Sequence, residues 1–306
     1  MLSFFEALLI NPLLLAALFA GFAASIVSGI VGSYVVVKRI VFIAGSISHA
    51  VLSGIGCCIW LERTQGISWA SPLYGALVAA CLSALILGWI HLYFREREDS
   101  AISALWSIGM AVGVLFISQT PGFNVELTNF LIGNILWVSK SDLYLLWGLD
   151  GVVLLLVLLL HKRFLAICFD EEQARLQGLS VDRLYLLLLL LIAISIVLLI
   201  QVVGVLLVMT MLTIPPAVAN LVSFRLSHMM GIAIVLNIFL CFFGNLAAYH
   251  LDWPTGATIA LFAGILYVAA LFFLKKTPKH CCLRVLNQDA EREGFEPSIP
   301  LGGMRP

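Results

Sequence analysis

A histidine in an apolar segment is the side chain of this sequence best suited to chemistry. His49 belongs to the stretch FIAGSISHAVLSGIG (42–56), in which glycine and serine residues surround it. A neutral imidazole is a common ligand for transition metals, and small residues around it allow close helix packing or line a water-filled path. The residues alone favour the plainer interpretation, a packed histidine that is hydrogen-bonded to a serine hydroxyl on the next turn.

A polar segment between two apolar runs, LAICFDEEQARLQGLSVDR (165–183), is the second candidate. Acidic residues at its start and a glycine near its end predict a short amphipathic helix that ends at a left-handed glycine. Such a helix is a good surface for a soluble partner, and a solvated connector is the alternative that composition leaves open. The residues concerned are Asp170, Glu171, Glu172, Ala174 and Gly178.

The composition identifies the environment of these residues. Hydrophobic residues make up 62% of the 306 residues and charged residues 11%, whereas a soluble chain has about 45–50% and about 25%. Seventeen Lys and Arg balance seventeen Asp and Glu, so charge gives no reason to expect a nucleic-acid partner. The chain is predicted to be a polytopic membrane protein, in which intramembrane polar groups are costly and therefore informative.

Apolar runs long enough to cross a bilayer recur along the chain. A helix needs about 20 mostly apolar residues to cross roughly 30 Å of hydrocarbon. We therefore expect an all-α bundle of eight to nine transmembrane helices over 1–276, followed by a disordered cytoplasmic tail over 277–306. The runs are 13–37, 42–61, 72–94, 101–119, 143–160, 184–203, 204–222, 229–249 and 256–274.

Two of these runs carry residues that disfavour a simple helix in lipid. Pro215 and Pro216 remove two backbone donors, which predicts a short or broken helix near 204–222 that acts as a gate or as a packing element. Asp150 lies early in its run, roughly 10 Å deep at a rise of about 1.5 Å per residue. Its carboxylate is expected to reach the outer interface.

The distribution of basic residues predicts the orientation. With nine spans, thirteen Lys and Arg of the loops and of the tail as far as Arg284 fall on one side, and only Arg63 and Lys140 fall on the other. The positive-inside rule then places the N-terminus outside and the C-terminus in the cytoplasm. The sequence contains no GxxxxGKS or GxxxxGKT phosphate loop, no HExxH and no GxSxG. These motifs are those of ATPases, zinc proteases and esterases, so a transport role is favoured over an enzymatic one.

Five segments in order resemble the membrane permeases of ATP-binding-cassette transporters for zinc, manganese and iron. The resemblance covers about residues 13–274 and rests on the combination of segments, since each segment alone is weak. The segments are GIVGSYVVVKRIVFIAGSISHAVLSGIG (29–56), LTNFLIGNILWVSKSDL (127–143), the stretch 171–182, VVGVLLVMTMLTIPPAVANLV (202–222) and LDWPTGATIAL (251–261).

The resemblance implies a permease subunit, with no enzymatic activity of its own, of an ATP-driven importer of divalent transition-metal ions in the bacterial inner membrane. The implied partners are a second permease subunit, a cytoplasmic ATP-binding-cassette ATPase, an extracytoplasmic metal-binding protein and the lipid bilayer. No cofactor is expected to stay bound, because the metal ion is the transported substrate. His49 matches the family's histidine on the metal path, and residues 165–180 match the segment that docks on the ATPase.

One position departs from the family pattern. The family usually has an Asp four residues before this histidine, so that carboxylate and imidazole share one helix face, and here that residue is Gly45. We therefore expect a partner permease of different sequence that retains the Asp. The alternatives left open are a permease for a siderophore or another metal chelate, and a metal transporter or channel that works without an ATPase.

Overall fold

The computed structural model describes residues 12–67, 71–94, 98–121, 130, 140–223 and 225–274. Nine helices of this described part are long and apolar enough to cross a membrane, which confirms an all-α bundle and favours nine spans over eight. The predicted tail at 277–306 lies outside the described residues. The helices are α2 (Pro12–Val37), α3 (Val41–Gln65), α4 (Pro72–Tyr93), α5 (Glu98–Ser118), α7 (Lys140–Phe169), α8 (Glu171–Leu176), α9 (Val181–Val203), α10 (Val205–Val222), α11 (Leu226–Leu251) and α12 (Thr255–Leu274).

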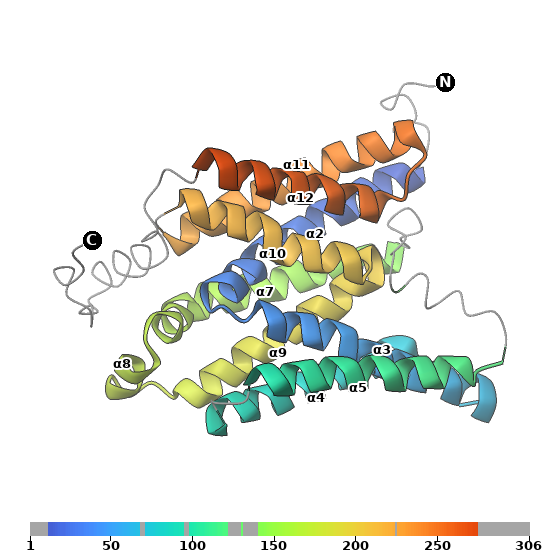
Figure 1. The fold of residues 1–306 in the computed structure, drawn as a ribbon, viewed down its shortest axis with the longest axis horizontal. Coiled ribbons are helices and arrows are strands. Elements are labelled where there is room, and N and C mark those ends of the chain that lie inside the picture. Colours follow the sequence, from blue (N-terminus) through green and yellow to red (C-terminus); the bar gives the residue numbers. More distant parts are fainter. Residues whose placement is uncertain are drawn as a thin grey trace.

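The helices pack in three neighbouring groups (Figure 1). On one side of the molecule α3 packs against α4 and α5, and on the other side α10, α11 and α12 pack together. Between them lie α2, α7 and α9, with α9 against α4 and α7, and α2 against α10 and α11. Much of the interior is built around α9, whose fully buried side chains include Tyr185, Leu188 and Ile192.

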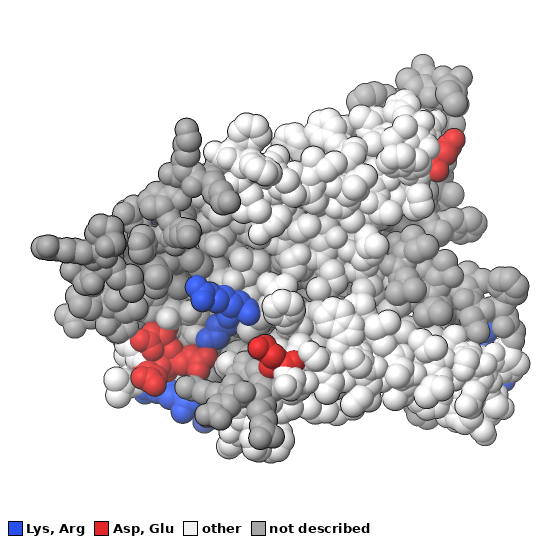
Figure 2. All heavy atoms as spheres, in the orientation of Figure 1, with Lys and Arg blue, Asp and Glu red and all other residues white. Residues whose placement is uncertain are grey.

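The surface has the pattern of a protein embedded in lipid. Leu158, Leu159 and Phe272 are 70%, 71% and 79% exposed, and apolar surface of this kind marks contact with a membrane or a partner. Figure 2 shows most charged side chains of the visible face gathered from the end where α8 lies to just below the centre, with a few at the opposite end. The short helix α8 therefore lies at one end of the bundle, beside the spans (Figure 1).

The proline-containing helix α10 is continuous. At 18 residues it is the shortest of the nine candidate spans in the described chain, and it runs through Pro215 and Pro216 to Val222. The prediction of a short helix is confirmed, and the prolines do not break it. Because proline lacks an N–H, the carbonyl four residues before Pro215, that of Met211, loses its helical donor. The side-chain amide of Asn237 in α11 donates to this carbonyl at 3.3 Å, so a neighbouring helix supplies the missing hydrogen bond.

A single glycine joins α9 to α10. Gly204 has φ 80° and ψ 161°, a region of backbone space that is essentially open to glycine alone. Its N–H donates to the carbonyl of Ile200, and its own carbonyl accepts from the N–H of Val208. Gly204 therefore ends α9 and begins α10, and two spans follow each other without a polar loop.

Candidate functional site

His49 lies inside the membrane-spanning part of α3, where its ring stacks on an indole from α5. The ring centroids of His49 and Trp106 are 4.4 Å apart, and the planes are inclined by 15°. The Nδ1 atom of His49 is buried and has no hydrogen-bond partner in the described structure. Nearby serines use their hydroxyls elsewhere, since Ser46 donates to the carbonyl of Ile102 at 3.0 Å. The serine-bonded histidine favoured from the residues alone is therefore not what the described structure contains.

A methionine from α10 reaches the same place. The hydroxyl of Ser48 has two acceptors within reach of its one hydrogen, the Sδ atom of Met209 at 3.2 Å and the carbonyl of Ala44, on its own helix, at 2.9 Å. A Cβ atom added to Gly45 would lie 3.2 Å from the Cε atom of Met209 and 3.4 Å from the indole of Trp106. Position 45, four residues before His49, thus faces a thioether and an indole, and we call His49, Gly45, Trp106 and Met209 the His49 site.

The His49 site is open on one side. The side chains of His49, Trp106 and Met209 are each only partly buried, although all three belong to helices that qualify as membrane spans. An imidazole that faces hydrocarbon is costly, so the open side of the site is expected to meet water or another protein chain. Within the described residues, no group of three or more His, Cys, Asp or Glu side chains is placed to hold a metal ion.

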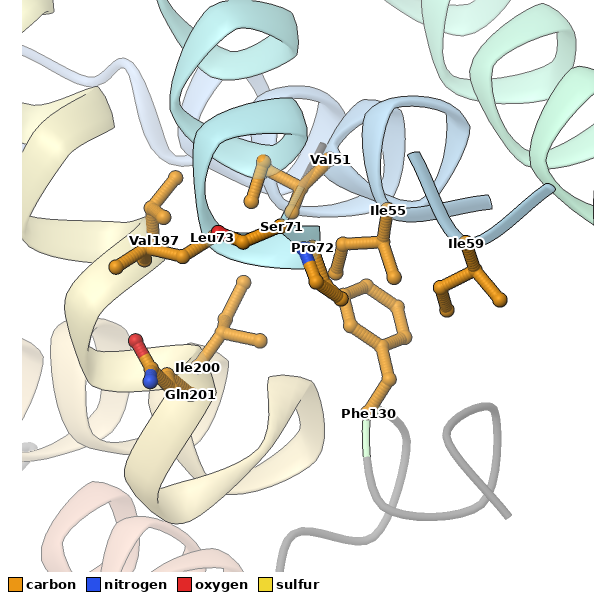
Figure 3. A pocket seen from close by; sticks show the side chains of 11 residues that line it. Val51, Ile55, Ile59, Ser71, Pro72, Leu73, Phe130, Val197, Ile200 and Gln201 are labelled. Atoms are coloured by element: carbon orange, nitrogen blue, oxygen red, sulfur yellow. The ribbon is translucent and has the colours of Figure 1, made fainter. Parts of the chain in front are cut away.

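A separate apolar cavity of about 500 Å³ lies between α3, α4 and α9 (Figure 3). Its polar lining consists of Ser71 and Gln201, and His49 does not line it. Hard and borderline cations need oxygen or nitrogen ligands with charge or strong dipoles, so this cavity is a poor place for a metal ion. The lining residues are Val51, Ile55, Ile59, Ser71, Pro72, Leu73, Ala76, Phe130, Val197, Ile200 and Gln201.

The polar segment between α7 and α9 forms the short helix α8 with a defined start and end. Asp170 is its N-cap, and one carboxylate oxygen accepts from the N–H groups of Glu172 at 2.8 Å and Gln173 at 3.1 Å. Gly178 follows the last turn with φ 82°, and its N–H donates to the carbonyl of Arg175 at 3.0 Å. The predicted short helix that ends at Gly178 is confirmed, with a cap at each end.

The two faces of α8 differ. Ala174 is 1% exposed and packs into the protein, and Glu171 points inward to an ion pair with Lys38. Glu172, Arg175 and Leu176 are exposed, and the leucine side chain is 89% exposed. We call these three residues the outer face of α8. Leu176 thus lies beside the charged side chain of Arg175 at an end of the bundle rather than in its apolar belt.

Three further residues singled out in the sequence are buried. Asp150 is 6% exposed, and both of its carboxylate oxygens lack a hydrogen-bond partner in the described structure. The expectation that this carboxylate reaches the interface is therefore wrong, because the side chain points into the bundle rather than along the helix. Pro215 and Pro216 are buried within α10, where they pack rather than line an open surface. Most of the family-like stretch 127–143 lies outside the described residues.

Comparisons with known proteins agree on one family. A model of the ABC 3 transport family matches residues 11–274. A relative from Chlamydia pneumoniae, described as a probable metal transport system membrane protein, is 50% identical over 272 residues, which are 89% of this chain and 91% of that one. The manganese transport system membrane protein MntC of Halalkalibacterium halodurans is 33% identical over 273 residues, with 89% and 91% covered.

A solved structure has the same fold. PsaBC from Streptococcus pneumoniae, in complex with a Fab, superimposes with a TM-score of 0.77 at 28% identity. The match covers 88% of this chain and 95% of that one. The correspondence therefore extends over most of both chains.

Proposed function

Because the chain belongs to the ABC 3 transport family, we propose that it is the permease subunit of an ATP-driven importer of divalent transition-metal ions, with His49 on the metal path. The observation that carries the proposal is the unpartnered, buried Nδ1 atom of His49, in a site that is open on one side within the membrane. The names of the relatives from Chlamydia pneumoniae and Halalkalibacterium halodurans support a metal as the substrate.

The stacked ring of His49 suits a transient ligand. Contact with Trp106 holds the imidazole in one plane, so its nitrogens need no reorganisation when an ion arrives. A single neutral nitrogen binds a divalent ion weakly compared with a full set of three or four ligands. Weak binding is what a path requires, because an ion that is held too tightly does not leave.

The missing carboxylate points to a second, different permease subunit. Gly45 provides no oxygen ligand, and the space beside it is occupied by Met209 and Trp106. The open side of the His49 site gives such a subunit a place to contribute the Asp that this chain lacks. A purified transporter that contained this permease only as a homodimer and imported metal at full rate would contradict this subunit composition.

The remaining partners are proposed to bind at the two ends of the bundle. The outer face of α8, with Leu176 at its centre, is the proposed docking surface for a cytoplasmic ATP-binding-cassette ATPase. The proposal accordingly has α8 and the C-terminus in the cytoplasm and the N-terminus outside, as the positive-inside rule predicts. An extracytoplasmic metal-binding protein would deliver the ion at the opposite end, and Pro215 and Pro216 remain candidates for a gate.

Substitution of His49 by alanine tests the proposal in reconstituted transporter. We expect His49→Ala to reduce ATP-dependent uptake of radioactive zinc or manganese by about tenfold or more, as loss of groups around metal ions typically does. The matched control is His228→Ala, which removes an exposed histidine at the start of α11. Co-purification of the ATPase should be unchanged in both variants. Undiminished uptake by His49→Ala would remove His49 from the path, and uptake by the permease without ATPase or nucleotide would contradict the importer itself.

A further inference from the structure

An ion pair joins the docking helix to the end of α2. Lys38 follows the last residue of α2, and its Nζ atom lies 2.6 Å from the Oε1 atom of Glu171, the first residue of α8. The same ammonium donates to the carbonyl of Ile167 at 2.8 Å. The side chains of Lys38 and Glu171 are only 12% and 15% exposed. Removing one partner of such a pair leaves an uncompensated, largely buried charge, so the contact resists separation.

Two more helices meet at the same carboxylate. The Nε2 atom of His91, near the end of α4, is 3.6 Å from the Oε1 atom of Glu171. The ring of His91 stacks on Tyr185 of α9 with centroids 4.4 Å apart, and the Nζ atom of Lys38 is 5.8 Å from the centroid of the same phenol. We call Lys38, His91, Glu171 and Tyr185 the Glu171 clamp.

The carboxylate of the Glu171 clamp is held in its charged form. The hydrogen bond from His91 and the interactions with Lys38 lower the pKa of Glu171 to about 2, against the desolvation that burial causes. At neutral pH the carboxylate of Glu171 is therefore ionised, and it is fixed by charge as well as by packing.

The clamp is connected directly to the helix that carries His49. Only three residues, Lys38 to Ile40, separate α2 from α3. Arg39 has φ 62°, and the N–H groups of Arg39 and Ile40 donate to carbonyls of the last turn of α2 at 3.1 and 3.0 Å. The junction is short and hydrogen-bonded to α2, so a displacement of Lys38 is expected to move the first turn of α3. His49 lies about two turns further along that helix.

We propose that Glu171 is a positioning residue that ties the ATPase-docking helix α8 to the start of α3, so that movement of α8 moves the helix bearing His49. The proposal rests on the proposed function, because it assumes that an ATPase drives α8. It divides the residues of α8 into two sets. The outer face binds the ATPase, and the inward carboxylate passes the displacement to Lys38.

The test measures how much metal is transported for each ATP hydrolysed. The complete transporter is reconstituted in proteoliposomes with Glu171→Gln, Lys38→Met, or both, and uptake and ATP hydrolysis are measured on the same samples. We expect each single variant to lower the ratio of metal transported to ATP hydrolysed about fivefold or more, within the usual range of coupling between sites. The double variant should transport as much metal per ATP as the more impaired single variant, since both changes break the same contact between Lys38 and Glu171. Lys38→Arg keeps the charge and should retain more of the ratio than Lys38→Met.

Controls separate coupling from docking and from folding. Asp99→Asn makes the equivalent acid-to-amide change at an exposed carboxylate near the start of α5, outside both the Glu171 clamp and the outer face of α8, and should leave the ratio unchanged. Gel filtration and co-purification of the ATPase show whether each variant is folded and assembled. Unchanged ratios in Glu171→Gln and Lys38→Met, losses that multiply in the double variant, or loss of the ATPase from assembled Glu171→Gln would each overturn the proposal. Failure of the unsubstituted transporter to couple uptake to ATP would instead count against the proposed function.

Discussion

The crossing of α3 and α4 gives a sharp prediction for stability. At this crossing Gly54 and Gly75 face each other, and a Cβ atom on either one would overlap the backbone carbonyl oxygen of the other. The obstructing atoms belong to the main chain, so no side-chain rotation relieves the overlap. Close contact of two helices through small residues is a recurrent mode of packing in membranes.

The expected effect of Gly54→Ala is a difference of two opposing contributions. Alanine stabilises a helix interior by about 1 kcal/mol relative to glycine. Overpacking at a tight contact destabilises by about 1–3 kcal/mol and by more when backbones must separate. Because the blocked atom is a carbonyl oxygen, the larger value applies, and the net result is a loss of roughly 2 kcal/mol or more. Gly75→Ala should behave in the same way, since the contact is reciprocal.

Thermal unfolding of the purified permease in detergent measures this effect. Gly148→Ala is the matched control, because this α7 glycine is exposed and a Cβ atom there meets nothing within 4 Å. We expect a lower midpoint for Gly54→Ala and an equal or higher midpoint for Gly148→Ala. If Gly54→Ala unfolded at the same temperature as Gly148→Ala, the close approach of α3 and α4 would be refuted.

Two further predictions concern α8. Asp170→Ala removes the N-cap that holds the first turn and should cost about 0.5–2 kcal/mol of helix stability, measured as weaker co-purification of the ATPase, whereas Asp170→Asn should retain the cap. Because the folded pKa of Glu171 is lowered from 4.5 to about 2, its contribution to stability is complete above about pH 4.5 and is lost as the pH falls toward 2. Thermal unfolding in detergent should show a midpoint that falls over this acid range, and part of this fall should be missing in Glu171→Gln. Identical pH curves for the two proteins would contradict the prediction.

The spans and the caps of α8 are features that local sequence determines. A helix in lipid must be apolar over about 20 residues whatever its neighbours are, so hydropathy alone locates nine such runs. Asp170 and Gly178 act through hydrogen bonds within a few residues, which is why their positions predict the bounds of α8. The same reasoning located His49 as a polar residue in an apolar segment.

The neighbours of His49 were not predictable because they are long-range. Trp106 and Met209 come from α5 and α10, and nothing in their own segments marks them, since an aromatic residue and a methionine in an apolar run are ordinary. The continuity of α10 has the same origin. Asn237 restores the hydrogen bond that Pro215 removes, and no pattern near the prolines reveals a donor on the next helix. Lys38 likewise looks like an ordinary loop cation in the sequence, and only the structure shows that Glu171 lies beside it.

The tight packing of α3 bears directly on how a signal from α8 would reach the metal path. A displacement applied at Lys38 reaches His49 only if α3 moves as a unit instead of bending. Glycine contacts hold this helix on two sides, at Gly54 against α4 and at Gly56, whose added Cβ would lie 2.7 Å from a carbonyl oxygen of α5. Closely packed helices move between discrete arrangements rather than deforming continuously. The helices α3, α4 and α5 are therefore expected to shift together, which carries His49 and its stacking partner Trp106 as one body and keeps the imidazole oriented throughout the transport cycle.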